Sequence, residues 1–253
     1  MKRNELTLAL INAKYLLVES IRVPSSLVLG VLSPVIIFML FVLPNPSMRE
    51  NPELAARATV ALSLFGVLSN SIFNVAINTA QLYESQWGSY LRTLPMKPGP
   101  KILGYFISSI ALASLTVCLI FCVSKLSTAL SLNVIGIFCT VLTILLCSVP
   151  FMGLGLIVGC LTVPKTAIAL SQLIMMFLAF IGGLLMPTIM FSETANKLSV
   201  VTPARQALEL SLYAGGVTHD FPTDKFLGLF VWTIIFTLGA GYFHHLINIK
   251  KLK

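Results

Sequence analysis

A line of polar side chains runs along one strongly apolar segment, residues about 58–82. Its members are Ser63, Asn70, Asn74, Asn78 and Gln81. With 100° between successive residues of an α-helix, these side chains fall within about 80° of one helix face. They could form the wall of a substrate path, or they could bond a neighbouring helix at about 0.6–2 kcal/mol per contact. Both interpretations require this face to meet protein or water.

The residues that follow, about 84–101, form a candidate site of another kind. A short helical pattern begins with an acidic residue, places a tryptophan and two leucines on one face and ends at a proline. The residues of this pattern are Glu84, Trp87, Gly88, Leu91, Leu94 and Pro95. Apolar side chains beside basic ones suit the docking of a soluble partner. The alternative is a helix that lies at the membrane–water interface, with its tryptophan as part of the aromatic belt.

Catalytic and metal-binding patterns are not found in the sequence. It contains no GxSxG, HExxH or GxxxxGK[ST] motif, which are signatures of hydrolases, zinc proteases and ATP-binding loops. The five cysteines form no CxxC pair, and the three histidines are His219 and the adjacent His244 and His245. We therefore expect no catalytic residue, no metal site and no cofactor bound directly by this chain.

Composition indicates which elements must position these side chains. Of the 253 residues, 57% are hydrophobic and 10% are charged, whereas soluble domains are about 25% charged. Backbone polar groups inside a bilayer must be satisfied within the chain, so only helices and closed barrels span it. Apolar runs of about 20 residues match helices, because barrel strands alternate over about ten residues. The sequence predicts an all-α polytopic membrane protein.

Six transmembrane helices are predicted within a single transmembrane domain, residues 1–253. They cover residues about 23–43, 58–82, 102–123, 133–160, 166–188 and 226–247. Residues 1–22 precede them as an amphipathic elbow helix, with Leu6, Leu10 and Ile21 on its apolar face. Residues about 190–224, of mixed polarity, form an outer segment between the fifth and sixth spans.

Charge predicts the orientation of these helices. With both termini in the cytoplasm, eleven Lys and Arg fall on the inner side and six on the outer side, as the positive-inside rule requires. The formal net charge is +8, but the cations are dispersed over short loops and are not interleaved with aromatics. We therefore expect no nucleic-acid partner.

The predicted spans lie within stretches that contain no Asp, Glu, Lys or Arg. These stretches are residues 23–48, 58–83, 102–124, 126–164, 166–192 and 226–249. Ion-coupled carriers place ionisable groups in the membrane because these groups carry the coupling ion. The absence of such groups favours a transporter that receives its energy from another subunit. A secondary carrier or channel that works without ATP is the alternative.

Together these features resemble a permease subunit of the ABC-2 class of ATP-binding-cassette exporters over nearly the whole chain. That family has an elbow helix, six spans, and a coupling segment between spans two and three. The coupling segment matches Glu84, Gly88, Leu91, Leu94 and Pro95. The outer segment also resembles the family, where it folds as short re-entrant helices, and Arg205–Leu212 has a helical pattern. One departure is Ser85, where the family usually has a basic residue after the acidic one.

The resemblance implies a permease dimer, of like or unlike halves, in the cell inner (plasma) membrane. Two separate ATP-binding subunits would hold ATP and Mg²⁺ and act through residues 84–101, while membrane lipid surrounds the spans. The uncharged spans favour export of a drug-like, antibiotic or other amphipathic substrate, with lipid or lipid-linked polysaccharide as the alternative. The pair Gly155 and Gly159 offers a close helix approach.

Overall fold

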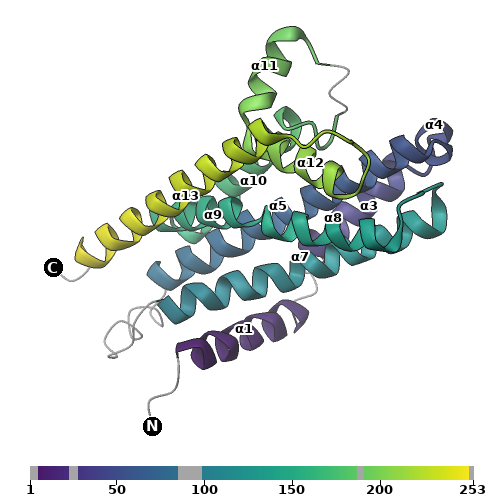
Figure 1. Cartoon of the computed structure of the whole chain (residues 1–253). Helices are drawn as coiled ribbons and strands as arrows, with labels where there is room; N and C mark the ends of the chain where they lie inside the picture. The colour runs from purple at the N-terminus through teal and green to yellow at the C-terminus, as the bar shows by residue number, and fades with distance from the viewer. Residues whose placement is uncertain (1–4, 23–27, 85–98, 187–190, 251–253) are drawn as a thin grey trace.

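The computed structural model describes residues 5–22, 28–84, 99–186 and 191–250, and every regular element in these ranges is a helix. The helices, in chain order, are α1 (Glu5–Arg22), the π-helical turn η1 (Val28–Leu32), α3 (Ser33–Phe41), α4 (Pro46–Glu50), α5 (Pro52–Glu84), α7 (Gly99–Ser127), α8 (Val134–Leu146), α9 (Val149–Leu161), α10 (Pro164–Ile181), α11 (Glu193–Val201), α12 (Pro203–Ala214) and α13 (Thr223–Lys250). Figure 1 shows α5 and α7 running side by side along the molecule, with α13 lying against α9. The predicted all-helical fold is confirmed.

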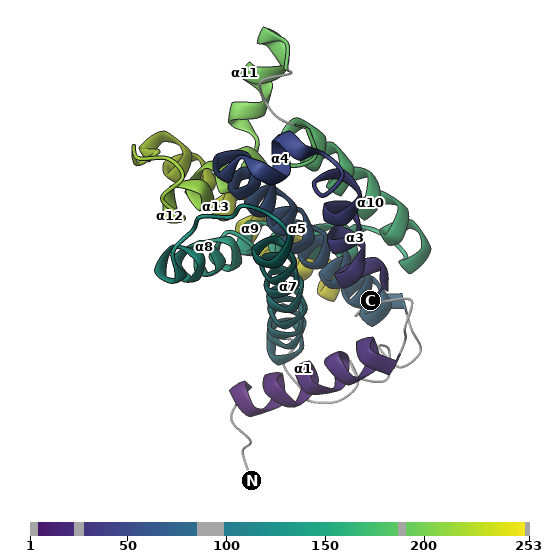
Figure 2. The same cartoon turned by 90° about the vertical axis from the view of Figure 1, so that its right-hand side faces the viewer.

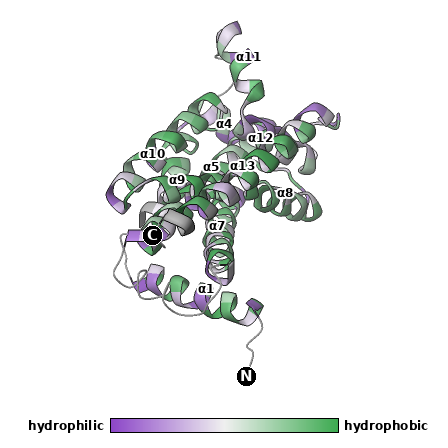
Figure 3. Cartoon of the chain, turned by 90° about the vertical axis from the view of Figure 1, so that its left-hand side faces the viewer, coloured by the Kyte–Doolittle hydropathy of each residue, from purple (hydrophilic) through white to green (hydrophobic). Residues whose placement is uncertain are grey.

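Within the described ranges, five helices are long and apolar enough to cross a membrane: α5, α7, α8 together with α9, α10, and most of α13. The predicted first span is described only from residue 28, where η1 and α3 provide the shorter apolar helix Gly30–Phe41. Figure 3 shows the hydrophobic character of α8, α9 and α10, in contrast to the mixed surface of α1. The structure therefore supports five of the six expected spans by length and composition.

The predicted fourth span, 133–160, agrees with one candidate span, Val134–Leu161, but the helix is interrupted within it. The helix breaks at Cys147 and Ser148, and the Ser148 hydroxyl donates to the Leu145 carbonyl oxygen at 2.5 Å. Pro150 lies just after the break. A proline has no N–H to continue a helical ladder, and its ring would collide with the carbonyl four residues earlier, here that of Leu146. Proline at the start of a new helix is tolerated, so the break lies immediately before it.

The predicted fifth span, 166–188, also differs, because α10 ends at Ile181. Gly183 adopts a φ of 75°, in the left-handed region that glycine enters without strain. The Leu184 N–H then bonds back to the Ala179 carbonyl oxygen at 2.9 Å, which completes a glycine-based helix end. The apolar run continues past the glycines, but the helix does not.

The centre of the bundle is α5, which packs against α7, α9, α10 and α3. The approach of α9 is close because it presents glycines. A Cβ on Gly159 would lie 2.5 Å from the Ala76 carbonyl oxygen, and one on Gly155 would lie 2.8 Å from that of Ile72. The expected close helix approach at this glycine pair is therefore present, and its partner is α5.

The amphipathic helix α1 crosses α7 at an angle (Figures 1 and 2). Small residues make the contact: Ala9 and Ala13 are buried, and a Cβ on Gly104 of α7 would lie 3.2 Å from the Ala9 carbonyl oxygen. Leu6 and Leu10 are exposed. The apolar stripe of α1 thus remains available to a membrane, while its alanine edge packs on protein.

The predicted outer segment contains two capped helices. The Ser192 hydroxyl accepts from the Ala195 N–H at the start of α11, and the Thr202 hydroxyl accepts from the Arg205 N–H at the start of α12. The run expected to be helical, Arg205–Leu212, lies within α12. Helix α12 packs against α8 and α13, whereas α11 projects from the bundle (Figure 2).

Candidate functional site

A cavity of about 590 Å³ lies beside the second half of α5. Its walls come from α1, η1, α3, α5, α7 and α10. The apolar part of the lining includes Phe65, Phe73, Met175 and Met176. Aromatic and methionine side chains give a surface that adapts to apolar groups of different shape. The cavity therefore combines a largely apolar lining with several amide side chains.

Four of the five residues of the predicted polar line contribute to this cavity: Asn70, Asn74, Asn78 and Gln81. Ser63, the fifth, does not line it. Its side chain is fully buried, and its hydroxyl has no hydrogen-bond partner among the described residues. The line is therefore split between the cavity wall and the interior of the bundle.

Asn70 joins three helical segments. Its Nδ2 lies 3.1 Å from the Gly30 carbonyl oxygen in η1, 3.0 Å from that of Gly66 and 3.2 Å from the Thr116 Oγ1 in α7. The Ser109 hydroxyl also donates to the Asn70 carbonyl oxygen at 2.9 Å. Asn70 is almost fully buried. The packing interpretation fits this residue, because its amide is already occupied by neighbouring helices.

Asn74 and Asn78 are arranged differently. The Asn78 Nδ2 donates to the Asn74 carbonyl oxygen at 2.7 Å and also to the Asn74 Oδ1. The Asn74 Nδ2 is buried and has no partner among the described residues. Both side chains line the cavity and bond only within α5, so in the described residues neither ties α5 to another helix. Gln81 is exposed one turn further on.

The further polar lining includes one amide and one carboxylate, and sequence reasoning missed both. Gln172 comes from α10 and Glu19 from α1, and both are exposed. Of the described residues that line the cavity, Glu19 alone carries a formal charge. A single amide within the 18-residue apolar helix α10 was a usable signal for Gln172. Nothing in the sequence pattern indicated that Glu19 would line the same cavity as the asparagines of α5.

The expected coupling residues are described only at their first member. Glu84 is exposed and is the last residue of α5. Trp87, Gly88, Leu91, Leu94 and Pro95 lie outside the described residues. Just before this segment, the Tyr83 hydroxyl bonds the Nδ1 of His244 in α13, with ring centroids 6.0 Å apart. The end of α5 is thus tied to the last helix at the point where the segment begins.

Comparison with known proteins decides the family. Residues 7–214 match the family described as "ABC-2 type transporter". The chain belongs to this family. The matched range includes every residue that lines the α5 cavity, so the cavity is part of the ABC-2 membrane domain. The chain thus carries an ABC-2 type transporter membrane domain over most of its length.

A more specific relative is similar over part of the chain. The Bacillus subtilis (strain 168) protein named "Putative transport permease YvfS" is 24% identical over 143 residues, which are 56% of this chain. The aligned region spans 58% of that relative's length. Its printed name agrees with the ABC-2 membership and gives no substrate.

Proposed function

We propose that this chain is the permease subunit of an ATP-driven exporter whose cargo moves along the α5 cavity. The observation that carries the proposal is the wall formed by Asn74 and Asn78. These amides face an apolar cavity and make no hydrogen bond to another helix among the described residues. The Asn74 Nδ2 is buried without a partner among the described residues, which is costly unless the group binds something.

The cargo that fits this lining is amphipathic and drug-like, as an antibiotic would be. Phe73 and Met176 provide apolar contacts, and the asparagines provide donors and acceptors. The Glu19 carboxylate at the α1 side favours a neutral or cationic molecule over a polyanion. Export of a lipid or a lipid-linked polysaccharide is the alternative within the same family.

Energy would enter through residues 84–101. Two ATP-binding subunits would contact Trp87 and Leu91 on the cytoplasmic side and push on α5 and α7, which border this segment. The permease would act as a dimer in the plasma membrane, with both termini in the cytoplasm. The positive-inside distribution of Lys and Arg supports this orientation.

Reconstitution tests the proposal. The chain and its ATP-binding subunit are placed in proteoliposomes, and movement of a fluorescent amphipathic monocation is followed with ATP, without ATP and with a non-hydrolysable analogue. We expect transport only with ATP. Equal transport by the chain alone in ATP-free liposomes would identify a secondary carrier or channel and overturn the proposal.

The coupling part has its own test. The double variant Trp87→Glu, Leu91→Glu should lose co-purification of the ATP-binding subunit, because charge replaces the apolar docking face. Membrane insertion should be unchanged. The control is Leu198→Glu, an exposed residue on α11, away from residues 84–101 in the chain. Normal co-purification of the ATPase with the double variant would contradict the coupling assignment.

A further inference from the structure

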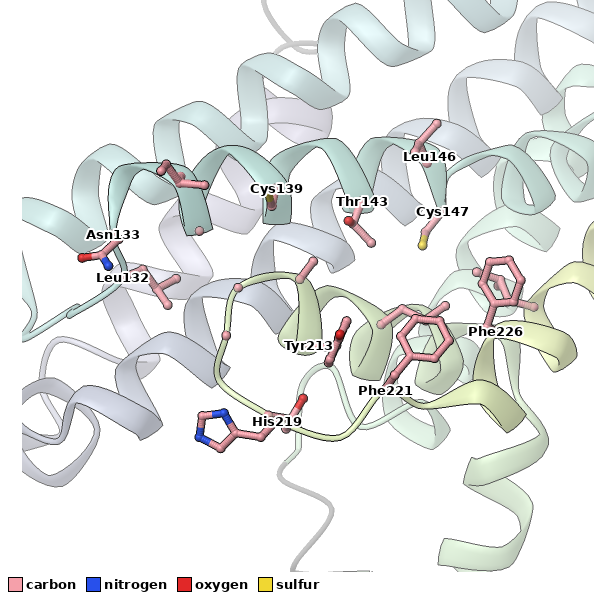
Figure 4. A pocket seen from close by; sticks show the side chains of 18 of the residues that line it. Leu132, Asn133, Cys139, Thr143, Leu146, Cys147, Tyr213, His219, Phe221 and Phe226 are labelled. Atoms are coloured by element: carbon pink, nitrogen blue, oxygen red, sulfur yellow. The ribbon is translucent and has the colours of Figure 1, made fainter.

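A second and larger cavity, of about 1190 Å³, forms a wedge-shaped groove between α8 and α13. The end of α12 and the loop that follows it, about residues 215–221, form its floor. Figure 4 shows the side chains of Cys139 and Thr143 pointing from α8 toward Tyr213 and Phe221 on the opposite side. This groove shares no lining residue with the α5 cavity.

The groove exists because the fourth apolar run is broken. After the break, α9 packs closely on α13, where a Cβ on Gly153 would lie 3.2 Å from the backbone of Phe236. Before the break, α8 packs instead on the end of α12, where a Cβ on Gly136 would lie 3.2 Å from the Gly215 carbonyl oxygen. Helices α8 and α13 therefore diverge from Cys147 and Pro150 and leave a wedge between them.

The lining changes from polar to apolar along this wedge. Asn133 and His219 lie at one end, and Phe226 and Cys147 lie toward the other (Figure 4). An aromatic cluster borders the apolar part, with ring centroids 5.2 Å apart for Tyr213 and Phe221, and 6.1 Å apart for Phe221 and Phe226. None of the described lining residues is Asp or Glu. Asparagine and histidine can donate hydrogen bonds to a phosphate group.

The rims of the groove continue into surface that faces lipid. On α8, Ile135 is 77% exposed and Leu146 is 64% exposed, and on α13 Phe230 is 57% exposed. These exposed apolar side chains suit contact with lipid chains, and the groove opens between them at the side of the bundle. An acyl chain can enter the wedge from the membrane without crossing water.

We propose that this groove holds one bilayer phospholipid. Its acyl chain fills the wedge between α8 and α13, and its phosphate lies at the end marked by Asn133 and His219. The lipid supplies the packing that α8 loses when it leaves α13, so it holds α8 at its distance from α13. This site is independent of the cargo path and of the direction of transport.

Photocrosslinking with a matched pair of variants tests this proposal. Thr143→Trp fills the wedge, whereas Leu142→Trp adds the same bulk one residue away on an exposed position of α8 that does not line the groove. The purified full chain is incubated with phosphatidylglycerol that carries a diazirine at the end of one acyl chain, and crosslinked peptides are mapped by mass spectrometry.

We expect crosslinks on the peptides of Leu146 and Phe230 in the parent chain and in Leu142→Trp, and a loss of tenfold or more in Thr143→Trp. Cys139→Phe, a second filling variant, should show the same loss. Equal labelling of Thr143→Trp and Leu142→Trp, with equal melting temperatures, would overturn the proposal. Labelling spread evenly over the exposed face of α10 would also overturn it.

The headgroup is tested separately. The double variant Asn133→Ala, His219→Ala should lower crosslinking of the phosphatidylglycerol probe at least threefold, while a diacylglycerol probe without phosphate is unaffected. If the parent chain takes up both probes equally, the phosphate is not recognised, and the assignment of the polar end is wrong.

Discussion

The two halves of the polar line on α5 share one helix face but have different surroundings. In the first half, Ser63 and Asn70 are buried, and Asn70, which borders the cavity, has its amide bonded to η1 and α7. In the second half, Asn74 and Asn78 bond only within α5 and line a cavity. One helical stripe thus serves interhelical packing at one end and a candidate cargo path at the other.

The neighbours of α5 explain the difference. Near the first half, α7 comes so close that a Cβ on Gly66 would lie 2.6 Å from the Thr116 Cγ2. Near the second half, the facing wall is built by α1 and by α10, and a hollow remains between them and α5. A polar stripe therefore indicates contact with another helix or with a cavity. How closely the neighbouring helix packs determines which of the two it is.

The largest expected effect comes from Gly159→Leu, which would separate α9 from both the backbone and Thr79 of α5. Its Cβ would lie 2.5 Å from the Ala76 carbonyl oxygen, which cannot move without moving the helix. Overpacking of this kind costs about 3 kcal/mol. The melting temperature in detergent should fall sharply. In Gly241→Leu, where a Cβ meets nothing within 4 Å, the melting temperature should be nearly unchanged, and equal losses in the two variants would refute this account of the packing.

Asn70→Leu should have the next largest effect, on stability. The substitution removes the link to Gly30 and Thr116 and leaves buried acceptors unpaired, at a cost of about 2 kcal/mol. Unfolding monitored by circular dichroism in detergent should show the loss. If Asn70→Leu is as stable as the parent chain and only transport declines, Asn70 belongs to the cargo path and the division proposed for α5 is wrong.

Asn78→Leu should affect transport more than stability. The side chain bonds only Asn74 of its own helix, so the bundle loses little when it is replaced. Loss of one cargo hydrogen bond worth about 1.4 kcal/mol lowers the transport rate at low cargo concentration about tenfold. ATP-driven dye transport in proteoliposomes measures this rate. A melting temperature as low as that of Asn70→Leu would instead indicate a packing role.

Ser63→Ala should have the smallest effect and is the matched control on the same stripe. Its hydroxyl is buried without a partner among the described residues, so its removal should leave stability equal or slightly higher. Transport should be unchanged, because Ser63 does not line the cavity. A clear loss of transport in this variant would extend the path into the first half of α5.

The sequence predicted the helical class and the positions of most spans, because runs of uncharged apolar residues constrain the fold strongly. It did not predict the break before Pro150 or the early end of α10 at Gly183. A hydropathy average detects neither feature, because proline and glycine act through backbone geometry and not through hydrophobicity. The position of the groove between α8 and α13 depends on that break, so it could not be predicted either.

The candidate site was predictable only in part. The spacing of Asn70, Asn74 and Asn78 predicted one polar face, but the sequence could not show which amides would find partners on other helices. Glu19 and Gln172 belong to helices distant in sequence, and only the packing of α1 and α10 brings them to the same cavity. Trp87 and Leu91 lie outside the described residues, so their coupling role stays a prediction.

The central claim is that cargo contacts the second half of α5, and photoaffinity labelling tests it most directly. A photoreactive derivative of the transported dye is activated on the reconstituted complex, with and without excess unlabelled dye. The label should fall on the peptides that contain Asn74, Asn78 and Gln172, and the unlabelled dye should compete with it. Competed labelling confined to the groove between α8 and α13, with none on these peptides, would contradict the account.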